Sequence, residues 1–447
     1  MLLSPLLLVT GGAFDSGDLR APPSHRARRK RPRVPGVLRD EPQYRLLFAG
    51  QVLSILGDRV TMVVLPFAVL AVGGSVGDVA LVSAAQFLPF ALLALPAGVW
   101  ADRLDRKRIL IVSDLVRLVC QLVAASLLLG GGATVPALVT IAAVYGAADA
   151  FFAPAFTGLL PATVSRVNLQ PANALRGLAF SLANIGGPIV AGLLIAYAGG
   201  PGGALLFDAL TFAVSIGLLL PLRPRVVEEV LHGEDPTATT RHFWMSLREG
   251  WGEVRSRSWL VAFLAGMSVY HVVVLPSIFV IGPVLMDQEL DGARSWAVIT
   301  ACFGVGNVLG DLLFLRWRPR FALRVASLML IGSSCQAAMI GSGLGTWGIG
   351  ALELLAGVCV TGAFTLWETS LGEHVPARSL SRVSSYDYLA TAGVIPLGNL
   401  IAGAASAAYG LHATLLAMTV IGVAASLAVA AVPAVRTLPR GAATVAG

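Results

Sequence analysis

Residues 98–108 read GVWADRLDRKR, a stretch of eleven residues in which six side chains are charged. The stretch lies between two apolar segments, 79–99 and 109–130, each close to the ~20 residues that a helix needs to cross a bilayer. A short charged loop between two such segments predicts a helical hairpin whose loop lies at one face of a membrane.

The composition of the whole chain is that of a membrane protein. Of 447 residues, 56% are apolar and 13% are charged, and the mean hydropathy is +0.78. A soluble protein carries roughly 45–50% apolar and about 25% charged residues, so this composition excludes a soluble globular fold. The segments are continuously apolar and do not alternate, which excludes a membrane β-barrel. The 49 glycines favour close packing of helices inside a bilayer.

Twelve apolar segments are predicted to span the membrane, six on each side of a polar stretch. They lie at 46–73, 79–99, 109–130, 135–157, 172–198, 204–221, 259–283, 296–316, 321–342, 346–370, 384–409 and 411–433. The predicted fold class is an all-α polytopic membrane protein with twelve transmembrane helices in two six-helix pseudo-symmetric bundles. The predicted division is a basic, disordered cytoplasmic tail at 1–43, bundles at 44–222 and 259–435, a cytoplasmic linker with an amphipathic helix at 223–258, and a cytoplasmic tail at 436–447.

The basic residues predict the orientation. Of the 32 lysines and arginines, 29 lie in loops and tails on one side of the predicted helices. The opposite side has only Arg294, while Arg59 and Arg117 lie within helices. Because positively charged loops stay in the cytoplasm, both termini are predicted to be cytoplasmic.

Two matches between the halves indicate an internal duplication. GPIVAGLLIAYAG at 187–199 aligns without gaps on GNLIAGAASAAYG at 398–410, a shift of 211 residues. Leu65 and Pro66 match Leu275 and Pro276 at a shift of 210. Near-equal shifts in two places predict a parallel duplication in which two bundles enclose a central cavity.

Read as G-x-x-x-D-R-x-x-R-K-R, residues 98–108 resemble the signature loop of the major facilitator superfamily, with Asp105 where a glycine is usual. The resemblance implies a conformational latch, because arginines in this loop can reach carboxylates on neighbouring helices and an aspartate can accept from a helix N-terminus. The latch candidates are Gly98, Asp102, Arg103, Arg106, Lys107, Arg108 and Asp149, with Asp149 expected to receive Arg106 or Arg103. The alternative is that the arginines only anchor the loop.

The fifth segment carries a second motif. Gly187, Pro188, Ala191 and Gly192 are similar to the G-P-x-x-G-G motif that the superfamily's proton-exchanging exporters carry. A proline and a groove of small residues would let this helix pivot against its neighbour. Tight packing alone is the other explanation of the same residues.

Charged residues inside the membrane are costly and mark functional candidates. Asp58, beside Arg59, lies about 18 Å along the first helix and is the first choice for a proton-coupling carboxylate, the alternative being a structural pair with the fourth or fifth helix. Asp114 and Arg117 are spaced i, i+3, which predicts an intrahelical pair, with a proton relay as the alternative.

The second half offers two further candidates. Glu353 has no basic residue within a turn and is the second coupling candidate. His271 can titrate near neutral pH, although a single histidine often only satisfies a hydrogen bond of the core.

Two passages resemble one branch of the superfamily, the bacterial exporters related to macrolide efflux proteins and the enterobactin exporter. They are AADAFFAPAFTGLLPATVSRVNLQPANAL at 147–175 and VSSYDYLATAGVIPLGNLIAG at 383–403. The resemblance implies a proton-driven antiporter of the bacterial plasma membrane that exports an amphipathic drug, antibiotic or siderophore by alternating access.

Other functions have less support in the sequence. It contains no H-E-x-x-H, no G-x-x-x-x-G-K-[ST] and no nucleophile elbow, and the four cysteines lie in apolar stretches without C-x-x-C spacing. We therefore expect no enzyme, metal or cofactor, and no nucleic-acid or obligate protein partner; the expected partners are a small amphipathic substrate and membrane lipid. The rival functions are an importer or facilitator on the same fold, and a non-transporting receptor or assembly factor.

Overall fold

The computed structural model describes residues 34–225 and 250–440, and every regular element in these ranges is helical. Within these two ranges, twelve helices are long and apolar enough to cross a membrane, which confirms the predicted fold class. The first half contains α1 (Val34–Asp40), α2 (Pro42–Ala71), α3 (Val76–Arg103), α4 (Arg106–Leu129), α5 (Val135–Leu159), α6 (Leu169–Tyr197) and α7 (Gly200–Leu219).

The second half contains the same number of spans but more interruptions. Its helices are α9 (Ser258–Val269), α10 (Gly282–Glu289), α11 (Ala293–Arg316), α12 (Ala322–Ser334), α13 (Gln336–Ile340), α14 (Thr346–His374), α15 (Ala377–Thr391), α16 (Ile395–Tyr409), α17 (Leu411–Ala431) and α18 (Pro433–Thr437). Two π-helical turns, Tyr270–Val274 and Ser277–Ile281, join α9 to α10, so these elements form one span of 32 residues.

The predicted tail at 1–43 is helical where the structure describes it, which corrects the expectation of disorder for residues 34–43. Val37 of α1 is buried against the first bundle, and Leu38 beside it is partly buried in the same cluster. Pro42 begins α2 at a position where its missing N–H leaves no bond unmade. Residues 1–33, most of the linker and residues 441–447 lie outside the described part, so the remaining domain boundaries stay a prediction.

Between α1 and α2, Glu41 fastens this region to the first bundle. Its carboxylate accepts hydrogen bonds from the backbone of Ser165 and the side chain of Asn168, and it pairs with Arg225 at 2.9 Å. Burial alone would raise the pKa of Glu41, but these hydrogen bonds and the charge of Arg225 lower it to about 2.

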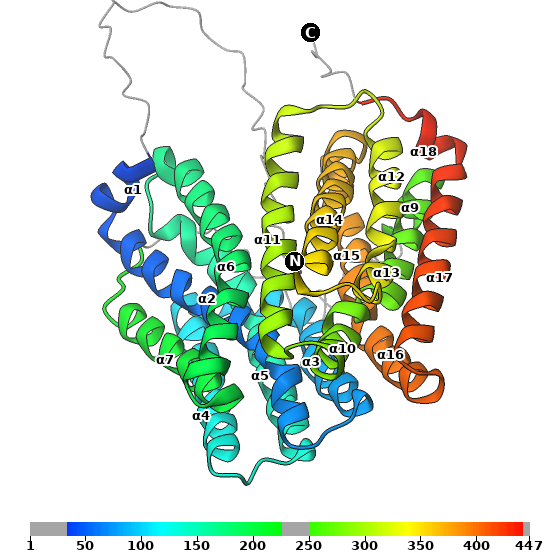
Figure 1. Cartoon of the computed structure of the whole chain (residues 1–447). Coiled ribbons are helices and arrows are strands. Elements are labelled where there is room, and N and C mark those ends of the chain that lie inside the picture. The colour runs from blue at the N-terminus through cyan, green and yellow to red at the C-terminus, as the bar shows by residue number, and fades with distance from the viewer. Residues whose placement is uncertain (1–33, 226–249, 441–447) are drawn as a thin grey trace, which may run out of the picture.

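The ends of the helices fall into two groups. Figure 1 shows α1 and α18 at one end of the molecule and α10 towards the other. We call these the α1/α18 end and the α10 end. The charged loop between α3 and α4 lies at the α1/α18 end, because α2 leaves that end and α3 returns to it.

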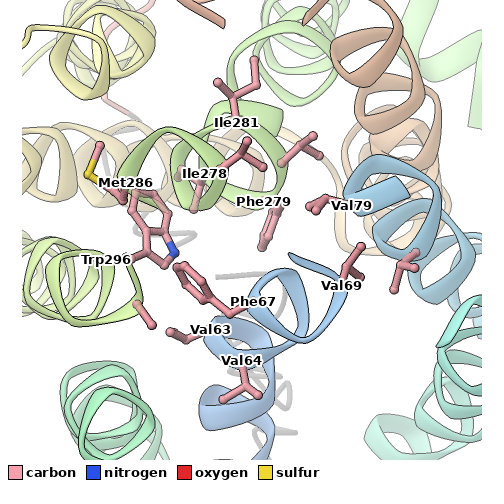
Figure 2. Close-up of a cluster of buried hydrophobic side chains, with 14 of the residues drawn as sticks. Val63, Val64, Phe67, Val69, Val79, Ile278, Phe279, Ile281, Met286 and Trp296 are labelled. Atoms are coloured by element: carbon pink, nitrogen blue, oxygen red, sulfur yellow. The ribbon is translucent and has the colours of Figure 1, made fainter. Parts of the chain in front are cut away.

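The apolar core distinguishes the two ends. At the α1/α18 end, one cluster is made only of first-half residues such as Leu47 and Leu110, and another only of second-half residues such as Phe263 and Trp367. At the α10 end, a single cluster joins both halves. Figure 2 shows Val63 and Phe67 of α2 beside Trp296 of the second half. The halves therefore pack together at the α10 end and have separate cores at the other.

Small residues bring the halves close along two helix pairs, α6 with α11 and α3 with α16. A Cβ on Gly192 would lie 2.6 Å from the Cβ of Ala297, and a Cβ on Gly403 would overlap Ala80. At an earlier position of α6, the backbone oxygen of Asn184 would lie 2.6 Å from a Cβ on Gly304 of α11. Side chains larger than these would force the helices apart.

Candidate functional site

Arg117 of α4 is the centre of the charged site. Its side chain has no exposure, and its guanidinium contacts three carboxylates from three helices. Asp114 lies one turn earlier on α4, which gives the predicted intrahelical pair. Asp58 of α2 is 3.3 Å away and Asp149 of α5 is 3.4 Å away. One positive charge is thus shared among three acidic groups.

Neighbouring side chains hold this cluster in place. The guanidinium of Arg117 lies 4.5 Å from the ring centroids of both Phe152 and Phe212. Ser215 of α7 donates to the second oxygen of Asp114 at 2.7 Å. Tyr145 of α5 donates a short hydrogen bond to Asp58. Asp58 therefore forms an ion pair with α4, the third span, and a hydrogen bond with α5, the fourth span. Aromatic faces and hydroxyl donors replace the water that these charges would otherwise need.

The cluster is buried on one side and open on the other. Asp114 and Arg117 have no exposure, whereas the side chains of Asp58 and Asp149 are 26% and 37% exposed. Both of these carboxylates line a cavity in the first half. Protons or ligands in the cavity can therefore reach two of the three carboxylates but not the guanidinium.

Arg59 lies beside the cluster but turns away from Arg117. Its guanidinium lies 4.6 Å from the ring centroid of Phe180 on α6, and it donates to the sulfur of Met62 at 3.7 Å. Gly187 of the α6 motif contacts the Cβ of Arg59 so closely that no side chain would fit there. α6 continues through Pro188 to Tyr197 without interruption, and its role as a hinge stays a prediction.

A second cavity adjoins the first across the boundary between the halves. Arg59, Met62 and Phe279 line both. The first cavity is otherwise lined by first-half residues that include aromatic side chains, Phe87, Phe90, Phe152, Phe156 and Phe180. The second adds Asn184, Tyr270, His271, Trp296, Phe303, Asn307 and Phe364. Together they form a surface of apolar side chains, many of them aromatic, with polar and charged groups between them, as in small-molecule sites.

Glu353 of α14 forms a separate polar chain in the second half. It is 2% exposed and accepts a hydrogen bond of 2.7 Å from Gln336. Gln336 in turn accepts from the hydroxyl of Tyr270 at 3.1 Å, so the chain reaches a residue that lines the second cavity. His271 lines the same cavity, and its Nδ1 lies 2.7 Å from the carbonyl oxygen of Met267.

The signature loop is fastened to the first half. Asp105 caps α4 by accepting from the backbone of Lys107, and the side chain of Lys107 donates to the carbonyl of Leu220 at 2.8 Å. Arg108 pairs with Asp105 at 3.4 Å and is largely exposed. The surroundings of Gly98 and the side chains of Asp102 and Arg103 lie outside the described part of the structure, so the role of these residues as a latch stays a prediction.

The expected contact between Asp149 and Arg106 was wrong. Arg106 donates to the carbonyl of Gly158 at 3.0 Å, whereas Asp149 contacts Arg117. Nine residues separate Asp149 from Gly158, which is about 13 Å along a helix. Asp149 therefore lies too deep in α5 for an arginine at the start of α4.

Two residues of the site were missed in the sequence. Asp208 of α7 is fully buried and accepts hydrogen bonds from Thr61 and Gln121, both at 2.6 Å. It lies in an apolar segment, so the rule that singled out Asp58 also applies to it. Tyr145 is uncharged, and its contact with Asp58 depends on how α2 and α5 face each other, which has no signal in the sequence.

A comparison with known families matches residues 47–392 to the model of the Major Facilitator Superfamily. The chain belongs to this superfamily. It is therefore a multi-pass membrane protein of a transporter family and not an enzyme, and the resemblance drawn from residues 98–108 is confirmed.

Relatives within the superfamily are efflux proteins at modest identity. The multidrug efflux pump Tap of Mycobacterium tuberculosis is 28% identical over 420 residues, which cover 89% of this chain and 94% of Tap. Macrolide efflux protein A of Streptococcus pyogenes is 26% identical over 64% of this chain and 70% of its own length. The enterobactin exporter EntS of Shigella dysenteriae is 27% identical over 72% and 74%.

Solved structures match the fold. The nucleoside transporter NupG superimposes with a TM-score of 0.66 at 14% sequence identity, over 87% of this chain and 98% of NupG. At this identity the match shows the arrangement of helices and nothing about substrate.

Proposed function

We propose that this chain is a proton-coupled antiporter that exports an amphipathic small molecule from the cytoplasm by alternating access. The observation that carries the proposal is the sharing of buried Arg117 by Asp114 and by two carboxylates that open to the cavity, Asp58 and Asp149. If all three were ionised, the cluster would hold a net charge of minus two in a site where only Asp58 and Asp149 are partly exposed, to the cavity. Such a charge is costly, so the cluster favours binding a proton.

The exchange step follows from which groups the cavity reaches. A proton on Asp58 or Asp149 lowers the negative charge around Arg117. A substrate entering the same cavity removes water from these carboxylates and changes the balance between their neutral and ionised forms. Proton and substrate therefore compete for one state of the cluster, which is what exchange in opposite directions requires.

The orientation and state of the molecule support export. The 29 basic residues on one side favour a cytoplasmic location for the α1/α18 end. Because the halves pack together at the α10 end, the cavity in this structure would then be closed to the outside and would face the cytoplasm. A pump in this state would load substrate from inside the cell.

The lining of the cavity and the relatives support the substrate class. Aromatic side chains from both halves offer flat apolar surfaces, and Asp58, Asp149 and Arg59 offer charges of both signs. The relatives named multidrug, macrolide and enterobactin exporters suggest a drug, antibiotic or siderophore.

The test uses the purified full-length protein in liposomes with an imposed pH gradient and a pH-sensitive dye inside. A macrolide, a lipophilic cationic dye and enterobactin are added one at a time. We expect at least one of them to cause proton flux, and we expect Asp58→Asn to abolish it while the protein still folds. Asp40→Asn, the same change at an exposed residue, is the matched control.

Two outcomes would contradict the proposal. Movement of a substrate without proton flux would indicate a facilitator or another coupling ion. Full proton flux in Asp58→Asn would mean that this residue does not couple transport.

A further inference from the structure

A buried carboxyl beside the Arg117 cluster has no role in the exchange step described above. Asp208 of α7 has no exposure and does not line either cavity. Its Oδ2 accepts from the hydroxyl of Thr61 and from the amide of Gln121, and Gln121 also donates to the Thr61 hydroxyl at 2.8 Å. Three side chains from α2, α4 and α7 thus form a closed triangle that contains no positive charge.

The packing of α2 against α7 makes room for this carboxyl. A Cβ on Gly57 would overlap Oδ1 of Asp208, so the carboxyl lies directly against the α2 backbone. The next residue along α2 is Asp58, and Thr61 lies three residues after Asp58 and therefore on the same side of the helix. The triangle and the coupling cluster are neighbours along one helix.

The charged and titratable groups around Asp208 leave its negative charge without a partner of its own. α2 contributes Asp58, α4 contributes Arg117, and α5 contributes Tyr145. Arg117 already contacts three other carboxylates. An ionised carboxylate in such a place is costly, whereas a carboxylic acid is not.

The triangle can hold Asp208 with or without a proton. A hydroxyl both donates and accepts, so Thr61 can donate to the carboxylate or accept from the carboxylic acid. Only the hydroxyl hydrogen of Thr61 needs to turn between the two states, and the heavy atoms keep their positions. The hydrogen bond from Gln121 to the carboxyl persists in both.

We propose that Asp208 is a second proton-carrying residue of the transport cycle, beside the Arg117 cluster. When a proton binds Oδ2 of Asp208, the carboxylate becomes a neutral acid that donates to the hydroxyl of Thr61, and the hydrogen of that hydroxyl turns away. When the proton leaves, Asp208 is a carboxylate again and accepts from Thr61 as before, so Thr61 keeps its own proton throughout. This inference rests on the proposed proton exchange and deepens it, because it adds one proton per cycle.

The test compares the wild-type protein with Asp208→Asn in the same liposomes. The measured quantity is the ratio of protons to substrate, obtained from the substrate gradient that a known pH gradient sustains. We expect Asp208→Asn to retain exchange with one proton fewer, so that a gradient of one pH unit sustains about tenfold less accumulation. Exchange with an unchanged ratio would overturn the proposal.

A second measurement needs no transport and separates this proposal from the proposed function. Infrared difference spectra of the purified full-length protein, taken between acidic and alkaline buffer, detect the carbonyl band of a protonated carboxyl. We expect a band in the wild type that is missing in Asp208→Asn, shifted in frequency in Thr61→Val because the acid loses its hydroxyl acceptor, and normal in Thr61→Ser. If Asp208→Asn retains every band, Asp208 carries no proton, whether or not the protein exchanges protons for a substrate.

Discussion

The first helices of the two halves share a Leu-Pro dipeptide at matching positions but differ in structure. Leu65 and Pro66 align with Leu275 and Pro276, yet α2 continues through Pro66 over 30 residues, while π-helical turns stand on both sides of Pro276. Such turns place an extra residue in the helix and rotate the side chains that follow. The same dipeptide is therefore compatible with a regular helix and with an interrupted one.

The two helices also carry different chemistry. α2 presents Asp58 and Arg59 to the cavity, whereas the interrupted helix presents Tyr270, His271 and Phe279. The ring of Phe279 lies 5.2 Å from that of Phe87 in the other half. The two halves therefore line the cavities differently: the first contributes the charged side chains together with aromatic rings, and the second contributes aromatic rings with uncharged groups.

The largest effect is expected when the positive charge that the three carboxylates of the first half share is removed. Arg117→Met would leave three carboxylates with no guanidinium, and we expect a loss of about 3–5 kcal/mol in the free energy of unfolding. Thermal unfolding in detergent measures it. Because the single variant can fail to fold, the double variant with Asp114→Asn is made as well, and we expect it to recover part of the loss. An Arg117→Met protein as stable as the wild type would contradict the shared-charge description.

The α1/α18 end extends the comparison to the loops. Glu41 is buried and its carboxylate accepts hydrogen bonds from three donors. Glu373 of the second half is 25% exposed and pairs with Arg440. The pKa of Glu41 lies below its ordinary value of 4.5. The ionised side chain therefore contributes its full share to the stability of the fold above about pH 5, and this contribution is lost as the pH falls towards 2.

We therefore expect Glu41→Gln to lower stability by about 2 kcal/mol at neutral pH and to reduce the loss that the wild type shows on acidification. The measurement is the unfolding temperature at neutral and acidic pH, with Glu373→Gln as the matched control. Equal pH dependence in the wild type and Glu41→Gln would show that this carboxyl is not responsible.

The contribution of the aromatic lining to substrate binding can be tested by removing one ring. Phe279→Ala removes a ring that lines both cavities, and we expect substrate binding to weaken by about 1–2 kcal/mol while the ratio of protons to substrate is unchanged. Binding titrations and the liposome assay provide the two quantities. A changed proton ratio would mean that coupling is not confined to the charged half.

The smallest effect is expected at the carboxyl of the second half. Glu353→Gln keeps a side chain that can bond to Gln336, so we expect turnover to fall less than tenfold and stability to change by less than about 1 kcal/mol. Turnover in liposomes over a range of pH measures it. Loss of proton exchange as complete as in Asp58→Asn would place coupling in both halves.

The sequence predicted the fold because continuous apolar segments report directly on membrane insertion. It also singled out Asp58 and Arg117, since charges stand out in such segments. It did not predict that they contact each other, because helices that are far apart in sequence can face one another in many ways. The π-helical turns and the break at Cys335 between α12 and α13 were missed, since an apolar segment reads the same whether its helix is regular or not.

The contacts between small residues along α6 and α11 and along α3 and α16 have a consequence for ionic strength. Van der Waals packing of Gly192 against Ala297 and of Gly403 against Ala80 is not screened by salt. The basic loop between α3 and α4, at the α1/α18 end, interacts with its surroundings through charged side chains. At 0.1 M salt, interactions between exposed charges are screened beyond about 10 Å. We therefore expect added salt to act unequally on the two ends of the molecule. In the transport cycle proposed above, the balance between open and closed states would then depend on the surrounding electrolyte as well as on the chain.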